Sequence, residues 1–504
     1  MLATVRSAAL FGIDAYAVQI EVEVSNGMPG LTLVGLPDAS VRESRDRVRS
    51  AIRNSGYQFP RQHITVNLAP ADVRKQGSAF DLPIALGVLA AVGQLLRREI
   101  DDWLVLGELS LDGTIQAARG VLPIAVSARR SGATGLVVPR ANAAEASIVD
   151  GLRIVAVRSL IEAVESLNTR CPPTWTASPL DATRTLHDPP DFADVRGQAL
   201  PKRAVEVAAA GGHSLLLVGA PGGGKTMMAR RLAGILPPLG PDEALESTAI
   251  HSVAGMLPPD GGLLRERPFR APHSSASLAA LVGGGAGPRP GEVSLAHHGV
   301  LFLDEVLEFE RRALEALRQP LEDGFVRIAR AARSALFPSR FMLVAAMNPC
   351  PCGRRGDPGA ECRCTPGQVD RYQGRLSGPL RDRIDLAVEV ARTPVACLRA
   401  GAAEESSAAI RVRVLAARDR QRARFGPAAC QVNGHMTAKL VSLHCRLDRS
   451  LERLLEQAAA RFSLSARGHA RVLKVARTIA DLAGADCVRP EDLSEALQFR
   501  LPSL

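Results

Sequence analysis

Residues Gly219 to Thr226 read GAPGGGKT, between the apolar run LLLV and an amphipathic helical stretch. A glycine-rich loop between a buried strand and a helix lets backbone N–H groups surround an anion at the positive end of the helix. Lys225 would then reach the β- and γ-phosphates of ATP, and Thr226 would be a ligand of Mg²⁺. The predicted nucleotide-binding residues are Gly219, Ala220, Pro221, Gly222, Gly223, Gly224, Lys225 and Thr226.

Two further apolar runs end in polar residues that suit phosphate chemistry. VLFLDE ends in Asp304 and Glu305, and acids at the carboxyl end of a buried strand lie where α/β sheets bind ligands. Asp304 would hold Mg²⁺ through water, and Glu305 would orient and deprotonate the attacking water, which predicts ATP hydrolysis. FMLVAAMN ends at Asn348, whose amide could position the same water or touch the γ-phosphate.

Four of the nine cysteines form two CxC pairs in the turn-rich segment 348–366. Their spacing could hold one structural Zn²⁺ with four thiolates, which would fix a loop too polar to fold by burial. CxC is tighter than the usual CxxC, so reduced thiols and redox disulfides are the alternatives. Because the cluster follows Asn348 closely, we expect it to shape a loop beside the ATP site. The cysteines are Cys350, Cys352, Cys362 and Cys364.

Composition limits the classes of protein that this sequence can encode. The 504 residues are 46% hydrophobic and 23% charged, which predicts several folded domains. No run of 18 apolar residues occurs and the N-terminus lacks a signal-peptide pattern, so we expect a cytoplasmic protein without a membrane partner. The net charge of +10 favours a polyanionic partner, although Arg-rich proteins can be basic without binding nucleic acid.

The pattern of apolar residues divides the chain into four parts. Residues 1–167 alternate β-rich runs with helical stretches, which predicts an α+β domain. Residues 168–190 are rich in Pro, Thr and Asp and predict a linker. Residues 191–393 predict an α/β core with parallel strands, and residues 394–504 predict a helical domain.

Several segments resemble the YifB/ComM family of magnesium-chelatase-like AAA+ ATPases, which carry an N-terminal Lon-protease-like domain. The most discriminating are SLAHHGVLFLDE, AAMNPCPCG, RYQGRLSGPLRDRID and LSARGHARVLKVARTIADL. The resemblance implies a P-loop core with a helical lid and a homo-oligomeric ring, a hexamer, with ATP sites between subunits. It implies that Asn348 is the first sensor, Arg383 the arginine finger and Arg467 the second sensor, with Arg381 and Arg471 as alternatives.

The segment EDGFVRIARAARSALFPSRF resembles the presensor hairpin of AAA+ helicases. Arg327, Arg330 and Arg333 would then line the pore of a ring and contact DNA phosphates, although a basic surface hairpin is the alternative. ComM-like members are associated with DNA branch migration during natural transformation, which implies a helicase or translocase acting on branched or single-stranded DNA. ATP-dependent protein remodelling, a Lon-like protease-related ATPase and a chelatase-type motor subunit are the alternative functions.

Two other groups of residues invite a catalytic interpretation. KQGSAFDLPIALGVL resembles the nucleophile region of Lon, with Ser78 near the expected serine. A Lon-type dyad needs a lysine to deprotonate the serine, and no lysine occurs between Lys75 and Lys202. We therefore expect the fold without the peptidase. His297 and His298 could suggest a metal site, but we expect them to be structural.

Overall fold

The computed structural model describes most of the chain. It describes residues 1–504 except 72, 74, 76, 96–101, 170–172, 177–189, 259–260, 286, 330–333, 358–360, 394–403, 427–431, 463 and 501–504. Most of the predicted linker falls outside these residues. Every helix in the described part is too short or too polar to cross a bilayer.

The N-terminal region forms a seven-stranded sheet in the order β3-β4-β2-β1-β5-β8-β9, counted over the described residues. β1 pairs antiparallel with β2, while β5, β8 and β9 are parallel. α2 is buried along its whole length and packs on β1 and β2, because its sequence LPIALGVLAA is apolar on every face. The strands are β1 (Leu2–Phe11), β2 (Asp14–Ser25), β3 (Gly30–Val34), β4 (His63–Ala69), β5 (Trp103–Val105), β6 (Glu108–Leu109), β7 (Ile115–Gln116), β8 (Gly135–Pro139) and β9 (Arg153–Val157). The helices are α1 (Ala39–Asn54), α2 (Asp81–Ala91), α3 (Val121–Arg130), α4 (Ala143–Ala146) and α5 (Leu160–Asn168).

A second sheet has the order β11-β14-β17-β10-β18 within the described residues, and all its pairings are parallel. Its central strands are fully buried, as expected for apolar runs with no polar alternation. The strands are β10 (Leu215–Val218), β11 (Phe269–Arg270), β14 (Val300–Leu303), β17 (Met342–Met347) and β18 (Leu386–Glu389). This arrangement confirms the predicted α/β fold class.

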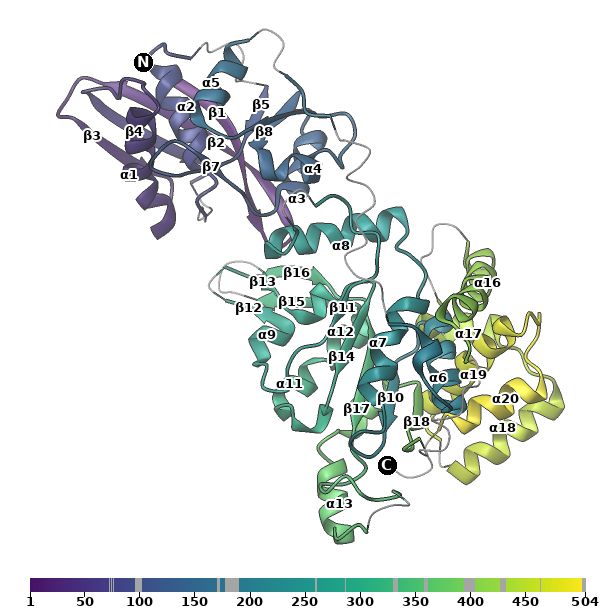
Figure 1. Cartoon of the computed structure of the whole chain (residues 1–504). Helices are drawn as coiled ribbons and strands as arrows, with labels where there is room; N and C mark the ends of the chain where they lie inside the picture. The colour runs from purple at the N-terminus through teal and green to yellow at the C-terminus, as the bar shows by residue number, and fades with distance from the viewer. Residues whose placement is uncertain are drawn as a thin grey trace.

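Helices and two hairpins lie around the second sheet (Figure 1). The C-terminal region that follows is built of helices. The helices before residue 394 are α6 (Ala199–Gly211), α7 (Lys225–Ile235), α8 (Pro241–Ala254), α9 (Leu278–Val282), α10 (Glu292–Leu295), α11 (Arg311–Ala316), α12 (Arg318–Asp323), α13 (Pro366–Gln373) and α14 (Gly378–Arg381). The hairpins are β12 (Gly283–Gly284) with β13 (Arg289–Pro290), and β15 (Phe325–Ala329) with β16 (Ser334–Pro338). The C-terminal helices are α16 (Ser407–Phe425), α17 (Ala438–His444), α18 (Arg449–Phe462), α19 (Ala466–Leu482) and α20 (Pro490–Gln498).

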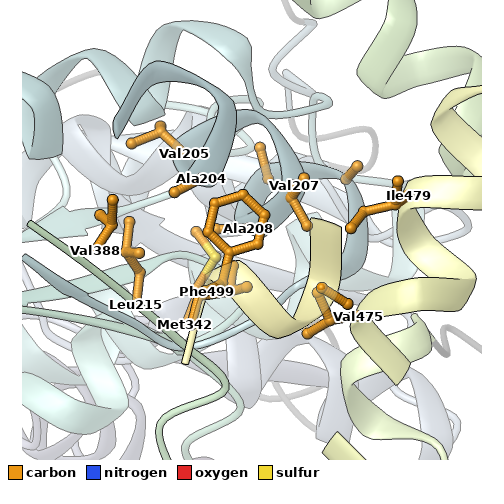
Figure 2. Close-up of a cluster of buried hydrophobic side chains, with 14 of the residues drawn as sticks. Ala204, Val205, Val207, Ala208, Leu215, Met342, Val388, Val475, Ile479 and Phe499 are labelled. Atoms are coloured by element: carbon orange, nitrogen blue, oxygen red, sulfur yellow. The ribbon is translucent and has the colours of Figure 1, made fainter. Parts of the chain in front are cut away.

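The C-terminal helices pack on the second sheet through α6. Figure 2 shows Ala208 of α6, Leu215 of β10 and Val475 of α19 around the ring of Phe499 in one apolar cluster. His213 adds a polar link, because its Nδ1 lies 3.0 Å from Asp385 Oδ2 and its Nε2 lies 2.8 Å from Thr478 Oγ1. His213 and Asp385 precede β10 and β18, so α19 lies at the amino-terminal edge of this sheet.

The N-terminal region contacts the region of the second sheet where its helix α3 packs on α8 (Figure 1). The N–H of Gly120 donates to the carbonyl oxygen of Ser252 at 3.2 Å, and the Ser252 hydroxyl donates to Glu145. Burial raises the pKa of Glu145, and its hydrogen bond from Ser252 acts in the opposite direction. A buried carboxyl therefore joins the two regions through polar contacts.

Candidate active site

The P-loop joins β10 to α7 and needs glycine at specific positions. A Cβ on Gly219 would lie 2.2 Å from the carbonyl oxygen of Val390, so the chain can pass beside the end of β18 only without a side chain. Gly224 has a φ of 95° and precedes α7, a conformation that favours glycine. The loop therefore presents backbone at the first turn of a helix, where an anion binds.

Lys225 begins α7, and its side chain is directed back onto the P-loop. Its Nζ donates to the carbonyl oxygens of Gly219 at 2.7 Å and Ala220 at 3.0 Å, and to Asn348 Oδ1 at 3.1 Å. The residue is 8% exposed. This geometry brings Lys225, on the helix after β10, together with Asn348, which follows the neighbouring strand β17.

Burial and nearby carboxylates have opposite effects on the ammonium of Lys225. Burial lowers the pKa of Lys225, and the carboxylates of Asp304 and Glu305 act in the opposite direction. A desolvated cation beside a backbone loop is suited to pairing with an incoming phosphate, because such a pair is stronger where water is excluded.

The acids lie at the carboxyl end of β14, beside the P-loop helix. The Thr226 hydroxyl donates to Asp304 Oδ2 at 2.6 Å, and Asp304 Oδ1 accepts the N–H of Glu305 at 3.0 Å. A hydroxyl and a carboxylate in contact are the hard oxygen donors that Mg²⁺ prefers, so these residues fit a magnesium nucleotide. Glu305 is exposed and has φ 49° and ψ 47°, a left-handed conformation that is uncommon outside glycine.

Two residues beside the P-loop were not predicted from the sequence. Gln198 Nε2 donates to the carbonyl oxygens of Gly223 at 2.8 Å and Ala391 at 3.1 Å. Arg392 donates to the carbonyl oxygen of Pro221 at 3.2 Å. The GQ pair before α6 was the available signal for Gln198, whose φ of 56° follows a positive φ at Gly197. Both residues support the P-loop from segments that flank the core.

Arg383 and Arg467 lie at the opposite edge of the sheet from the P-loop. Both guanidinium groups face Glu322: Arg383 forms a close ion pair with it, and Arg467 Nη2 lies 3.7 Å from Glu322 Oε1. The N–H of Asp385, two residues after Arg383, donates to the carbonyl oxygen of Ser214 at the start of β10. A four-residue strand spans roughly 13 Å, so the edge that carries these arginines is well separated from the P-loop.

The four candidate arginines differ in exposure and in partners. The Arg467 side chain is 66% exposed, whereas that of Arg383 is 10% exposed. Arg471 donates to the carbonyl oxygen of Ile384 at 2.9 Å and pairs with Asp382 at 3.1 Å, with its side chain 7% exposed. Arg471 therefore ties the lid to the core, which favours Arg467 as the more accessible sensor candidate. Burial lowers the pKa of the remaining candidate, Arg381.

The segment predicted to be a presensor hairpin contains β15 and β16, which pair antiparallel. Arg327 is exposed on β15, with its guanidinium 6.0 Å from the centre of the Phe325 ring. Arg330 and Arg333 lie outside the described residues. The hairpin β12–β13 lies alongside, since a Cβ on Gly283 would be 3.1 Å from Ile328 Cδ1 (Figure 1).

The four predicted cysteine ligands come together in space. Their sulfur atoms all lie within 4.8 Å of one another, and the separations of Cys350 from Cys352 and of Cys350 from Cys362 are 3.4 Å and 3.7 Å. Four thiolates on one zinc at about 2.3 Å would be about 3.8 Å apart. A hydrogen bond from the Arg354 backbone lowers the pKa of Cys352 to about 6, which favours its thiolate. The donor set and spacing fit zinc.

The cysteine loop contacts the P-loop directly. A Cβ on Gly353 would lie 2.6 Å from Pro221 Cδ, so a side chain there would collide with Pro221, and it would lie in ordinary contact with Asn348 Cγ at 3.8 Å. Gly353 also has a φ of 74°, and its N–H donates to the carbonyl oxygen of Cys350 at 2.9 Å. The order of this loop is thus coupled sterically to two elements of the nucleotide site.

Within the described residues, Ser78 has no lysine as a hydrogen-bond partner. Its hydroxyl donates to a carboxylate oxygen of Glu108. Lys75 is completely buried, and its ammonium donates to the carbonyl oxygen of Pro70. A carboxylate in contact with the serine is not the amine base of a Lon-type dyad. The absence of peptidase activity stays a prediction.

His297 and His298 form a hydrogen-bonded group with Glu246 of α8. Their Nε2 atoms lie 3.0 Å and 2.8 Å from Glu246 Oε2. The N–H of Arg340 donates to His297 Nδ1 at 3.0 Å, which leaves the proton of the neutral ring on Nε2. A protonated nitrogen cannot bind a metal, so His297 Nε2 serves as a structural link to α8 through Glu246. Burial lowers the pKa of His297 to about 4.

Comparisons with known proteins identify families that this chain matches. Residues 191–398 match the family described as magnesium chelatase, subunit ChlI, and residues 404–500 match its C-terminal part. Residues 20–142 match the related description, subunit ChlI of Mg-chelatase. These three matches together extend from the N-terminal sheet to α20.

Two relatives align with nearly the whole chain, and a third aligns with part of it. The chain is 45% identical to the uncharacterized protein YifB of Salmonella typhimurium over 513 aligned residues, which cover 99% of this chain and 97% of the relative. It is 45% identical to the competence protein ComM of Haemophilus influenzae over 508 residues, with the same coverage. Lon protease 2 of Bacillus subtilis is 28% identical over 133 residues, which cover 26% of this chain and 23% of the protease. The chain therefore belongs to the YifB/ComM family of magnesium-chelatase-like AAA+ ATPases, with a Lon-protease-like N-terminal region.

Proposed function

We propose that this AAA+ ATPase forms a homo-oligomeric ring of six subunits and couples ATP hydrolysis to movement on DNA in the cytoplasm. Its role would be that of a branch-migration helicase in recombination during natural transformation. The observation that carries the ATPase part is the cluster at one sheet edge, where Lys225 contacts Asn348 and Thr226 contacts Asp304. The competence protein of Haemophilus influenzae, 45% identical over its length, supports the biological setting.

We assign a part of hydrolysis to the residues at each strand end. Lys225 would exchange the carbonyl oxygens of Gly219 and Ala220 for the β- and γ-phosphate oxygens, which are stronger acceptors. Mg²⁺, held by Thr226 and through water by Asp304, would neutralise charge on the phosphates. Glu305 is exposed beside Asp304 and would take the proton of the attacking water.

Asn348 and the remote arginines would complete the transition-state contacts. Asn348 Oδ1 accepts from Lys225 at 3.1 Å, and this contact supports a role for its amide at the γ-phosphate of the same site. Arg383 and Arg467 lie at the far edge and would act on the nucleotide of a neighbouring subunit, where a rigid guanidinium fork suits phosphate. Their position supports a ring in which ATP sites form between subunits.

DNA is the proposed polymer because the accessible pore candidate is basic. Arg327 is exposed on the hairpin, and the chain carries a net charge of +10. Arg330 and Arg333, at the predicted tip, would add to the positive lining. Such a lining holds phosphates without reading sequence, which suits a motor that moves along DNA.

We further propose that the cysteine cluster holds a structural Zn²⁺. The sulfur separations of 3.4 to 3.7 Å among Cys350, Cys352 and Cys362, with the Cys364 sulfur within 4.8 Å of each, support four-thiolate coordination. The metal would fix a loop that contacts Pro221 and Asn348 through Gly353, and it would not take part in hydrolysis itself.

Substitution of the P-loop lysine tests the central claim. Lys225→Ala should abolish ATP hydrolysis, whereas Lys439→Ala, an exposed lysine of α17, should leave it unchanged. Undiminished hydrolysis by Lys225→Ala would refute the assigned ATP site. In the unaltered protein, hydrolysis should rise with forked or single-stranded DNA and not with casein. A rate that is insensitive to DNA would leave the ATPase standing and reject DNA as the polymer.

A further inference from the structure

A small cleft of about 60 Å³ opens at the amino-terminal edge of the second sheet, the edge away from the P-loop. Its walls come from residues just before β10, β14 and β17, and from the lid helix α16 and the segment that follows it. Its charged and imidazole side chains are Glu243, Arg267, His298, Arg340, Arg418 and His435. Three guanidinium groups and one carboxylate therefore share one cleft, which gives it an excess of positive charge.

Only one of the three guanidinium groups in the cleft has its charge matched. Arg267 Nη2 pairs with Glu243 Oε2 at 2.6 Å, and Arg267 Nη1 donates to the carbonyl oxygen of His298 at 2.6 Å. Within the described parts of the chain, neither Arg340 nor Arg418 forms an ion pair with a carboxylate. The side chain of Arg340 instead packs over Gly324 at the base of the β15–β16 hairpin.

Arg418 has a structural contact that does not neutralise its charge. Its Nε and Nη2 donate to the carbonyl oxygen of Ala209 at 3.2 Å and 2.7 Å, in the last turn of α6. A cation at a helix C-terminus is favourable, so this contact alone could explain the residue. However, it does not use Nη1. Desolvation, together with the smaller effect of the Arg267 charge, lowers the pKa of Arg418 to about 9, so the cleft disfavours another cation and favours an anion.

We propose that this cleft binds a phosphate group, held between Arg340 of the core and Arg418 of the lid. Guanidinium groups present paired N–H donors that match phosphate oxygens, and two of them from different elements can hold one anion. Binding there would join the base of the hairpin to the lid. The phosphate could belong to a nucleic-acid strand or be free inorganic phosphate. The inference does not depend on hydrolysis at the P-loop or on movement along DNA.

Thermal unfolding in inorganic phosphate, against chloride at equal ionic strength, tests the free-phosphate source. The measurements use full-length protein with Lys225→Ala, so that the P-loop contributes little. Phosphate should raise the Tm of this protein and of a version that also carries Arg422→Ala, a control on the same helix whose exposed side chain pairs with Asp419. The rise should disappear with Arg340→Ala. Arg418→Lys should retain part of it, which separates lost charge from lost packing.

Salt dependence of DNA binding tests the nucleic-acid source. With labelled single-stranded DNA, the logarithm of the association constant falls as the logarithm of the salt concentration rises. This negative slope should become shallower by about 0.7 for each phosphate contact that is lost. A smaller slope for Arg340→Ala without a phosphate effect on Tm would identify a strand phosphate, and the reverse would identify free phosphate. If neither the Tm shift nor the slope differs between Arg340→Ala and the Arg422→Ala control, the proposal is wrong.

Discussion

Removal of one thiolate from the cysteine cluster should weaken zinc binding strongly without unfolding the chain. Cys352 is the best position for this test because it is exposed, while Cys350 is buried. The sulfur atoms of Cys352 and Cys362 are 3.7 Å apart, close to the separation of about 3.8 Å expected on a shared zinc. Cys352→Ser keeps the size of the side chain and removes a ligand that is deprotonated easily.

The expected loss follows from dividing the binding free energy among the ligands. Structural zinc sites contribute about 10 to 16 kcal/mol at neutral pH, which is about 3 kcal/mol for each of four thiolates. A loss of about 3 kcal/mol corresponds to an affinity about 10²-fold lower. Because Gly353 contacts Pro221 and Asn348, zinc removal should also lower the rate of ATP hydrolysis.

The assay is competition with a zinc-responsive chelator, combined with metal analysis of the purified protein. The unaltered chain should carry one zinc, and Cys352→Ser should release it at a much lower chelator concentration. Cys487→Ser is the matched control, because Cys487 is also an exposed free cysteine but lies outside the cluster. A purified protein without zinc, or a Cys352→Ser variant with the affinity of the control, would refute four-thiolate coordination.

Three other perturbations have defined outcomes. Glu305→Gln should lower kcat by about 10² to 10⁴-fold while ATP binding changes little, as measured by turnover and filter binding; unchanged turnover would remove Glu305 from the role of base. Arg383→Ala should lower kcat by about 10³-fold or more, and mixing it with Lys225→Ala subunits should restore hydrolysis; no restoration would contradict action between subunits. Burial lowers the pKa of His297 from an ordinary 6.5 to about 4 in the folded protein, so between these pH values the unfolded chain binds one more proton than the folded chain. The free energy of unfolding should therefore fall as the pH drops from about 6.5 to 4, by up to about 3 kcal/mol. Urea unfolding at several pH values should show this dependence, and His297→Asn should reduce it; an equal dependence in both proteins would exclude His297 as the source.

Much of the nucleotide site could be predicted because its determinants are local. The P-loop is one contiguous strand–loop–helix unit. Gly219 is needed because a side chain would collide with the backbone of Val390, and Gly224 because of its positive φ. Asp304 and Asn348 follow continuous apolar runs. The carboxyl ends of parallel strands meet at one sheet edge, so these polar residues were expected near Lys225 before any contact was known. The CxC spacing likewise brought the cysteines together over a short loop.

The tertiary structure decided where the distant segments lie relative to this edge. The lid meets the amino-terminal edge through His213 and Thr478, which are 265 residues apart in sequence. That placement puts Arg383 and Arg467 around Glu322, and it brings Arg418 and Arg340 into the lining of one cleft. No periodicity or motif encodes such pairings, because they depend on which buried faces of α6, α16 and α19 pack together. Local backbone geometry thus determined the phosphate loop, while long-range packing of apolar faces determined which arginines share a site.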